Sequence, residues 1–185
     1  MRSIAKNASQ KLGFLFRTKK YFTSRQLFLI CKAQVRPVSE YCSHIWSSAP
    51  KQTFKLLDSV QRRAIRLVDD ASLTNSLTSL EHRRKVGDLS LFYRYFHGRC
   101  STEILSIVAP LAIPSILTRR VQSAHPFMVR LEICRTSLSQ DSFFQRTSRL
   151  WNSLPRKVFP EAYNLQKFKR NTNSHLLSLG LHDIP

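Results

Sequence analysis

Glycine is scarce in this chain: its 185 residues include four glycines, and none of them lies close to another. A glycine-rich loop of the kind that holds phosphates in P-loop or dinucleotide-binding proteins cannot be built from them. The sequence also contains no Gly-x-Ser-x-Gly motif and no His-Glu-x-x-His motif, which mark many hydrolases and metalloproteases. The motifs therefore give no support to these enzyme classes, and we predict no small-molecule substrate.

Paired metal ligands are missing as well. The four cysteines contain no Cys-x-x-Cys pair, and with the six histidines they show no zinc-ligand spacing. Cys42 and His44 are close in the sequence but have no partner pair, so we interpret them as packing or surface residues. We predict no metal and no cofactor, and free thiols in place of a disulfide framework.

A long apolar run is also absent. The first 22 residues carry Lys or Arg every few positions, which excludes the apolar region of a signal peptide. The most apolar stretch, residues 104–117, contains Pro110 and Pro114 and is too short and too interrupted to cross a bilayer. These features predict an intracellular protein, in the nucleus or the cytoplasm, with no membrane partner.

Acidic residues are strongly outnumbered. The chain has 11 Asp and Glu against 30 Lys and Arg, a formal net charge of +19. The excess is spread evenly, with +10 in residues 1–70 and +9 in residues 71–185, and the cations are interleaved with apolar residues. This pattern is typical of a folded domain with a basic surface, which indicates a polyanionic partner such as nucleic acid.

Apolar residues recur at helical spacing through most of the chain, which predicts a mainly α fold. Helices are expected over residues 1–17, 24–45, 50–68, 79–97, 145–153 and 164–179, with a kink or break at Pro37. Between these, residues 110–140 contain three prolines and an alternating pattern at 127–133, which predict an extended arm with one short strand. We therefore divide the chain into a helical domain (1–108), an extended or irregular segment (109–141) and a C-terminal helical region (142–185).

The helix over residues 50–68 has the clearest division into two faces. Its apolar side chains fill about half of a helical wheel, and they are Phe54, Leu56, Leu57, Val60, Ala64, Ile65, Leu67 and Val68. Lys51, Lys55, Arg62 and Arg66 fall within about 60° of one another on the other half. A solvated helix face is the alternative, but the charge of the whole chain favours phosphate binding by these cations.

Asp69 and Asp70 form the one carboxylate pair that could suggest a two-metal polymerase site. The pair ends a predicted helix and does not lie in a hairpin between strands, so we do not interpret it as catalytic. Phe143, Phe144 and Trp151 lie near two arginines and could stack on unpaired bases, although packing in an aromatic core explains them more simply.

Three stretches resemble one protein family, the non-LTR retrotransposon reverse transcriptases. Residues 33–50, AQVRPVSEYCSHIWSSAP, resemble the family's segment LVRPVLEYGSPVWSP, which follows the polymerase palm. Residues 57–67, LDSVQRRAIRL, resemble its helix LEAVQRRALRLI, and residues 142–155, SFFQRTSRLWNSLP, resemble its SFFPRTARLWNSLP. The resemblance extends over about residues 8–175 and is strongest to jockey- and CR1-like elements.

This resemblance implies the thumb and post-thumb region of an RNA-directed DNA polymerase. In that family a helical thumb holds the template–primer duplex, so a thumb-like helical bundle, an RNA–DNA hybrid or duplex partner and a palm domain partner are expected. The palm's aromatic-x-Asp-Asp turn is expected upstream of residue 1, and Val68-Asp69-Asp70 does not match it. No catalytic residue can be carried over, and we expect these residues to be inactive as a polymerase on their own.

The predicted function is therefore sequence-independent binding of nucleic acid through phosphate contacts. The predicted binding residues are Lys51, Lys55, Arg62, Arg63, Arg66, Arg83 and Arg94. Three alternatives stay open from the sequence. They are a helical protein-interaction module with solvated basic faces, an inert remnant of a decayed element, and an independent small RNA-binding protein of the ribosomal kind.

Overall fold

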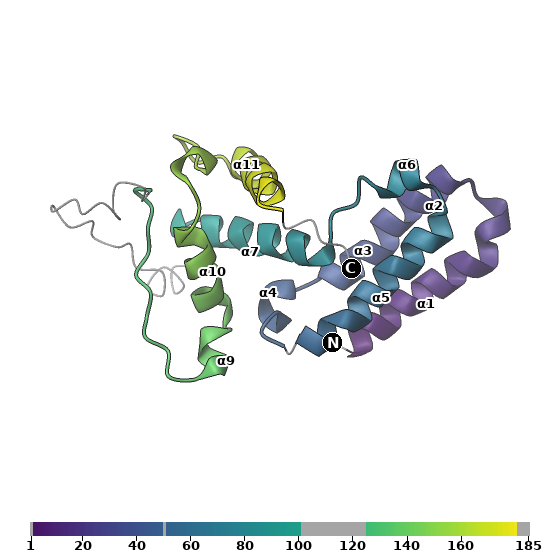
Figure 1. The fold of residues 1–185 in the computed structure, drawn as a ribbon, viewed down its shortest axis with the longest axis horizontal. Coiled ribbons are helices and arrows are strands. Elements are labelled where there is room, and N and C mark those ends of the chain that lie inside the picture. The colour runs from purple at the N-terminus through teal and green to yellow at the C-terminus, as the bar shows by residue number, and fades with distance from the viewer. Residues whose placement is uncertain (1, 50, 101–124, 181–185) are drawn as a thin grey trace. The chain divides into compact units, whose positions relative to one another are not determined.

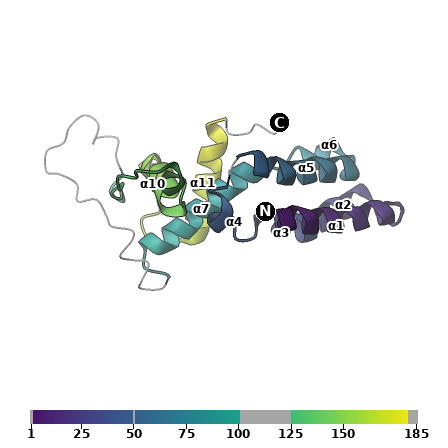
Figure 2. The same ribbon diagram turned by 90° about the horizontal axis from the view of Figure 1, so that it is seen from below.

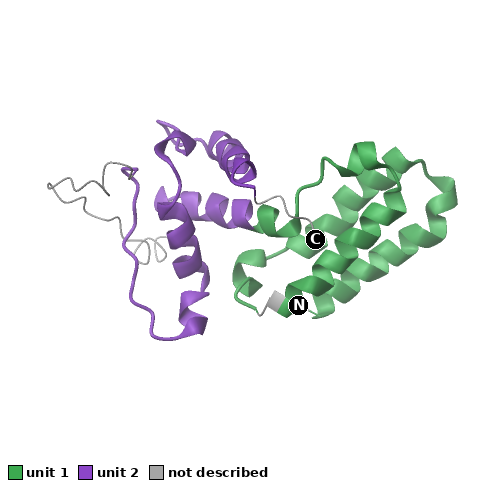
Figure 3. Cartoon of the chain, in the orientation of Figure 1, with its two compact units in different colours: residues 1–84, 184–185 green, residues 85–183 purple. Residues whose placement is uncertain are grey.

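The computed structural model describes residues 2–49, 51–100 and 125–180, and these residues are mainly helical, as predicted (Figure 1). No strand occurs among them. The chain divides into two compact units, residues 1–84 and 85–183, and the division falls inside one helix, α7 (Figure 3). The boundary predicted at residue 108 lies in the segment 101–124, outside the described residues.

The first unit contains most of the helices. In chain order they are α1 (Arg2–Thr18), η1 (Lys19–Tyr21), α2 (Ser24–Ile30), η2 (Cys31–Val35), α3 (Arg36–Glu40), α4 (Ser43–Trp46), α5 (Lys51–Val68) and α6 (Ala71–Thr74). Within this unit α1, α2 and α3 form one layer and α5 and α6 form another (Figure 2). The two layers enclose an apolar core to which α1, α2, η2 and α5 contribute, with Leu12, Leu27 and Leu67 among its fully buried side chains.

The second unit begins within α7 (Leu80–Phe96) and continues with α9 (Ser137–Gln140), α10 (Phe143–Asn152), η3 (Arg156–Val158) and α11 (Leu165–Ser178). Its core is aromatic, and Trp151 at the centre is fully buried. Phe92, Phe159 and Phe168 surround the indole ring, with ring centroids 5.0, 4.8 and 5.7 Å away.

Five of the predicted helices agree with the structure to within two residues at each end: α1, α5, α7, α10 and α11. Their ends follow the expected local chemistry. Ser79 Oγ accepts a hydrogen bond from the backbone N–H of His82 at the start of α7, and Asn164 Oδ1 accepts one from Lys167 at the start of α11. Gly98 ends the α7 region with a left-handed φ of 64°.

Pro37 changes the second predicted helix as its chemistry requires. Pro37 has no N–H to donate to the carbonyl of Ala33, so an unbroken α-helix cannot pass through it. The π-helical segment η2 lies just before Pro37, and the N–H of Arg36 bonds there to the carbonyl of Cys31, five residues back. The helix then ends at Glu40, and α4 follows as a separate turn.

The short strand predicted at residues 127–133 is wrong. Among the described residues Val129 alone forms an isolated β-bridge, which does not extend into a strand. Its N–H donates to Asn152 Oδ1 (3.0 Å) and its carbonyl accepts from Asn152 Nδ2 (2.9 Å). Asn152 at the end of α10 thus binds both backbone groups of Val129. The part of the predicted arm within residues 101–124 lies outside the described residues.

Cys42 has a left-handed backbone conformation, with a φ of 51°, between α3 and α4. This conformation brings Cβ too close to the backbone and costs a non-glycine residue about 1–2 kcal/mol. We expect Cys42→Gly to raise the free energy of unfolding by roughly 0.5–1 kcal/mol in urea denaturation. Glycine removes the strain from the folded state, and the greater entropy of the unfolded chain offsets part of that gain. Cys42→Ala keeps Cβ and should give no gain, so equal effects of the two substitutions would contradict this explanation.

Candidate nucleic-acid interface

Helix α5 holds most of the predicted binding residues, and its position is fixed by its apolar side. Leu57, Val60 and Leu67 are buried, and α5 packs against α1 and α2 through this side. Leu56, predicted on the apolar face, is 43% exposed at its edge. The opposite side of α5 is consequently turned to solvent, as the amphipathic pattern predicted.

The cations of α5 lie on that exposed side. Lys55, Arg63 and Arg66 are exposed and Arg62 is half-buried; we refer to these four residues as the α5 cation face. The side chain of Lys51 lies outside what the structure describes. From Lys55 to Arg66 the face extends about 16 Å along the helix, a length over which a nucleic-acid duplex presents roughly ten phosphates.

Asp58 lies one helical turn before Arg62 and was not considered in the sequence-based prediction. Burial raises the pKa of its carboxyl group, while the nearby guanidinium groups of Arg84 and Arg62 lower it. Arg84 itself is buried and lies 4.7 Å from the ring centroid of Phe54. Arg62 is thus half-buried with an acidic neighbour, whereas Lys55, Arg63 and Arg66 are the exposed cations of the face.

Arg83 is engaged inside the first unit. Its Nε and Nη2 both donate to the carboxylate of Glu40, the second at 2.8 Å, and this bidentate pair links α7 to α3. Arg36 lies 3.8 Å from the same carboxylate and also donates from Nη2 to the carbonyl of Thr78 (2.8 Å). The structure therefore gives Arg83 an intramolecular partner, whereas Arg94 is exposed on α7 and belongs to the second unit.

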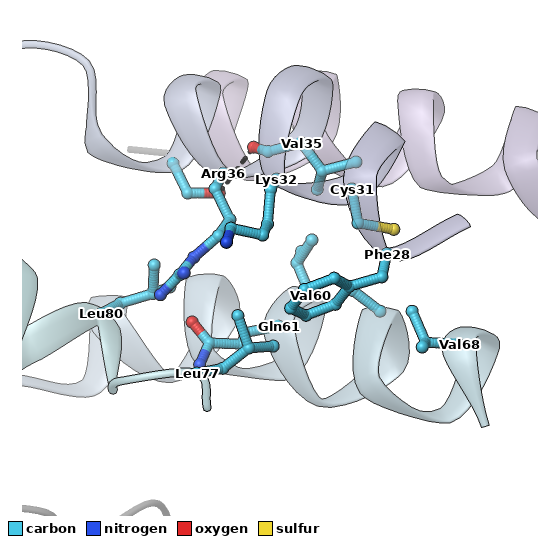
Figure 4. A pocket seen from close by; sticks show the side chains of 12 residues that line it. Phe28, Cys31, Lys32, Val35, Arg36, Val60, Gln61, Val68, Leu77 and Leu80 are labelled. Carbon is cyan, nitrogen blue, oxygen red and sulfur yellow. Dashed lines mark hydrogen bonds between the residues drawn. The ribbon is translucent and has the colours of Figure 1, made fainter. Parts of the chain in front are cut away.

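A small cavity lies between η2, α3 and α5 (Figure 4). Its walls are mostly apolar, and two polar atoms in it, Arg36 Nε and Gln61 Oε1, are buried without a hydrogen-bond partner. Burial, with the neighbouring Arg83, lowers the pKa of Arg36 to about 10, against the opposing effect of Glu40. The cavity volume of about 20 Å³ suits one water molecule and no organic substrate.

Asp69 and Asp70 lie between the end of α5 and the start of α6. Asp69 follows the last residue of α5 with a φ of 53°, and its N–H still bonds to the carbonyl of Ile65. Asp70 caps α6, where its Oδ1 accepts hydrogen bonds from the N–H groups of Ser72 and Leu73, and the Ser72 hydroxyl lowers the pKa of Asp70. Capping thus accounts for Asp70.

Phe143, Phe144 and Trp151 belong to the core of the second unit, which confirms the simpler of the two interpretations. All four cysteines are free thiols, as predicted. Within residues 2–49, 51–100 and 125–180, no group of three metal-ligating side chains is positioned to hold an ion. Over the same residues, no helix combines the length and apolar character needed to span a membrane.

In comparisons with known proteins, no family profile, curated protein or solved structure matches the chain.

Proposed function

We propose that this protein binds double-stranded nucleic acid, through phosphate contacts made by the α5 cation face. The observation that supports this proposal is the arrangement of Lys55, Arg63 and Arg66 on the solvent side of a helix whose opposite side is buried. A rigid helix presents such cations at fixed intervals, which suits the regular phosphates of a duplex and carries no sequence information. We further propose an RNA–DNA hybrid as the preferred duplex, in keeping with a thumb-like origin.

Two details of the described residues support an origin in a reverse transcriptase thumb. The segment that resembles the family's VQRRALRLI helix divides into buried Val60 and Leu67 and outward-facing arginines, as a duplex-holding helix requires. The family's motif also has glycine where this chain has Cys42, and the backbone there adopts the left-handed conformation that favours glycine. In this proposal the 185 residues bind the duplex and do not polymerise.

Salt-dependent binding of fluorescent duplexes to the full chain tests the proposal. The affinity should fall steeply as salt rises, and Arg63→Gln with Arg66→Gln should reduce the slope of log K against log salt by about 2. At moderate salt the double variant should bind both a DNA duplex and an RNA–DNA hybrid on the order of tenfold more weakly. Equilibrium anisotropy titrations at four salt concentrations measure both quantities.

Arg130→Gln with Arg135→Gln is the matched control, since both residues are exposed, lie in the second unit and carry the same charge. This control should keep the salt slope and the affinity of the unmodified protein. Equal losses in the two double variants would mean that net charge alone attracts the duplex, and the assignment to α5 would then be wrong.

A further inference from the structure

The turn that joins α1 to α2 exposes an unusual number of aromatic rings. Within nine residues Phe14, Phe16, Tyr21 and Phe22 are 57%, 43%, 71% and 36% exposed. Soluble proteins rarely leave such a concentration of large apolar side chains in water unless a partner covers it. We call residues 14–25 the α1–α2 tip.

Cations alternate with these rings. Arg17, Lys19, Lys20 and Arg25 are all exposed in the α1–α2 tip, and the first acidic residue of the whole chain is Glu40. Lys20 Nζ lies 4.9 Å from the centroid of the Tyr21 ring. The α1–α2 tip thus carries rings and positive charge with no carboxylate beside them in the sequence, which suits a polyanion that also has aromatic groups.

Local hydrogen bonds hold the backbone of the α1–α2 tip in place. The Thr18 hydroxyl donates to the carbonyl of Phe14 (3.1 Å), and the N–H of Phe22 bonds to the carbonyl of Lys19 (3.1 Å). Thr23 and Gln26 form a capping box at the start of α2. The turn extends past the C-terminal end of α5 (Figures 1 and 2). The exposed rings therefore lie on a projecting part of the first unit whose backbone is hydrogen-bonded.

From these observations we propose that the α1–α2 tip binds single-stranded nucleic acid, with unpaired bases stacking on its exposed rings and its cations contacting the phosphates. Proteins that bind single strands combine these two features, because every base has a face that can stack on an aromatic ring and every nucleotide carries a phosphate. A duplex hides its base faces, so this surface has a different ligand from the α5 cation face.

An anionic membrane is the other partner that aromatic and basic residues can serve, but the order of the residues argues against it. Lys19 and Lys20 form the turn η1 together with Tyr21, whereas Phe14 and Phe16 lie three or more residues back along α1. Insertion of the α1–α2 tip would therefore carry two ammonium groups deeper than these rings, at a large cost in desolvation. Phe14 and Phe16 also lie about 200° apart around α1, so they share no single face that could rest on a membrane.

Fluorescence anisotropy with labelled 20-nucleotide oligo(dT) and oligo(rU) tests this inference on the full chain. Phe14→Ala and Tyr21→Ala should each weaken binding by about fivefold to a hundredfold, the effect measured when one stacked base loses its ring. A 20-mer of abasic sites has the same phosphates and no bases, and its affinity should not change in either variant. Tyr21→Phe keeps the ring and should keep the affinity.

Leu29→Ala is the matched control, because Leu29 is exposed on α2 and apolar but has no ring. Unchanged oligonucleotide affinity in Phe14→Ala and Tyr21→Ala, or equal losses with the abasic strand, would overturn the inference. Binding to vesicles of phosphatidylserine and phosphatidylcholine that oligo(dT) does not displace would overturn it in favour of a membrane. Circular dichroism at 222 nm checks that each variant keeps its helices.

The two proposals can fail separately. Ring removal from the α1–α2 tip should leave duplex affinity unchanged, and Arg63→Gln with Arg66→Gln should leave the ratio of oligo(dT) to abasic-strand affinity unchanged. Loss of duplex binding with retained base-dependent single-strand binding would reject the proposed function alone. The reverse pattern would reject the inference for the α1–α2 tip alone.

Discussion

Replacing Trp151 with alanine is expected to lower the free energy of unfolding of residues 85–183 by about 3–5 kcal/mol, the usual cost of removing a large aromatic side chain from a core. The indole ring has no exposed surface and contacts rings from α7, η3's C-terminal end and α11. Its Nε1 also donates a hydrogen bond to the carbonyl of Phe127, which would be left without that donor. The second unit is therefore expected to unfold or become only marginally stable.

Hydrogen–deuterium exchange locates this effect. Peptides from α10 and α11 should lose protection in Trp151→Ala, while peptides from α1 and α5 keep it, because their core is separate. Trp46 is then the sole remaining tryptophan, and its emission reports on the first unit during urea unfolding. Leu138→Ala, at an exposed position of α9, should change stability by less than about 0.5 kcal/mol. A similar, small loss of protection in both variants would contradict the central role of Trp151.

Helical periodicity predicted the fold well where each helix buries one stripe of side chains. The failure at residues 127–133 shows the limit of this reasoning. Phe127, Val129, Leu131 and Ile133 alternate as a strand requires, yet Val129 is buried whereas Ile133 is 97% exposed. An alternating pattern forms a strand only when a partner pairs with it, and Asn152, 23 residues away, satisfies the backbone of Val129 in this chain.

The same distinction separates the parts of the candidate site that could be predicted from those that could not. The side of α5 that carries Arg63 and Arg66 follows from spacing within one helix. The pairing of Arg83 with Glu40 joins residues 43 positions apart, so it depends on tertiary packing that no local pattern contains. The α1–α2 tip did leave a signal in the sequence, namely aromatic and basic residues side by side in a segment without acids.

Asp88 on α7 is a buried carboxylate that pairs with Arg146 on α10. Its Oδ2 lies 2.9 Å from Arg146 Nη2, and the side chains of Asp88 and Arg146 are 7% and 27% exposed. Arg146 also donates from Nη1 to the carbonyl of Asp141, at 2.9 Å. Removing one partner of a largely buried pair costs more than the pair contributes, because the remaining charge stays in a poorly solvated place.

Arg146→Ala is accordingly expected to reduce the free energy of unfolding of the second unit by about 2–3 kcal/mol, somewhat less than for a fully buried pair because water still reaches the guanidinium group. Arg149→Ala, three residues along the same helix, removes an exposed arginine that donates to the carbonyl of Gln140, and should cost less than about 0.5 kcal/mol.

Urea denaturation of both variants and of Asp88→Asn with Arg146→Ala measures the difference. The double variant should be more stable than the sum of the two single effects predicts, since the uncompensated charge is gone. Equal costs for Arg146→Ala and Arg149→Ala would show that the ion pair contributes nothing beyond the packing of an arginine stem on α10.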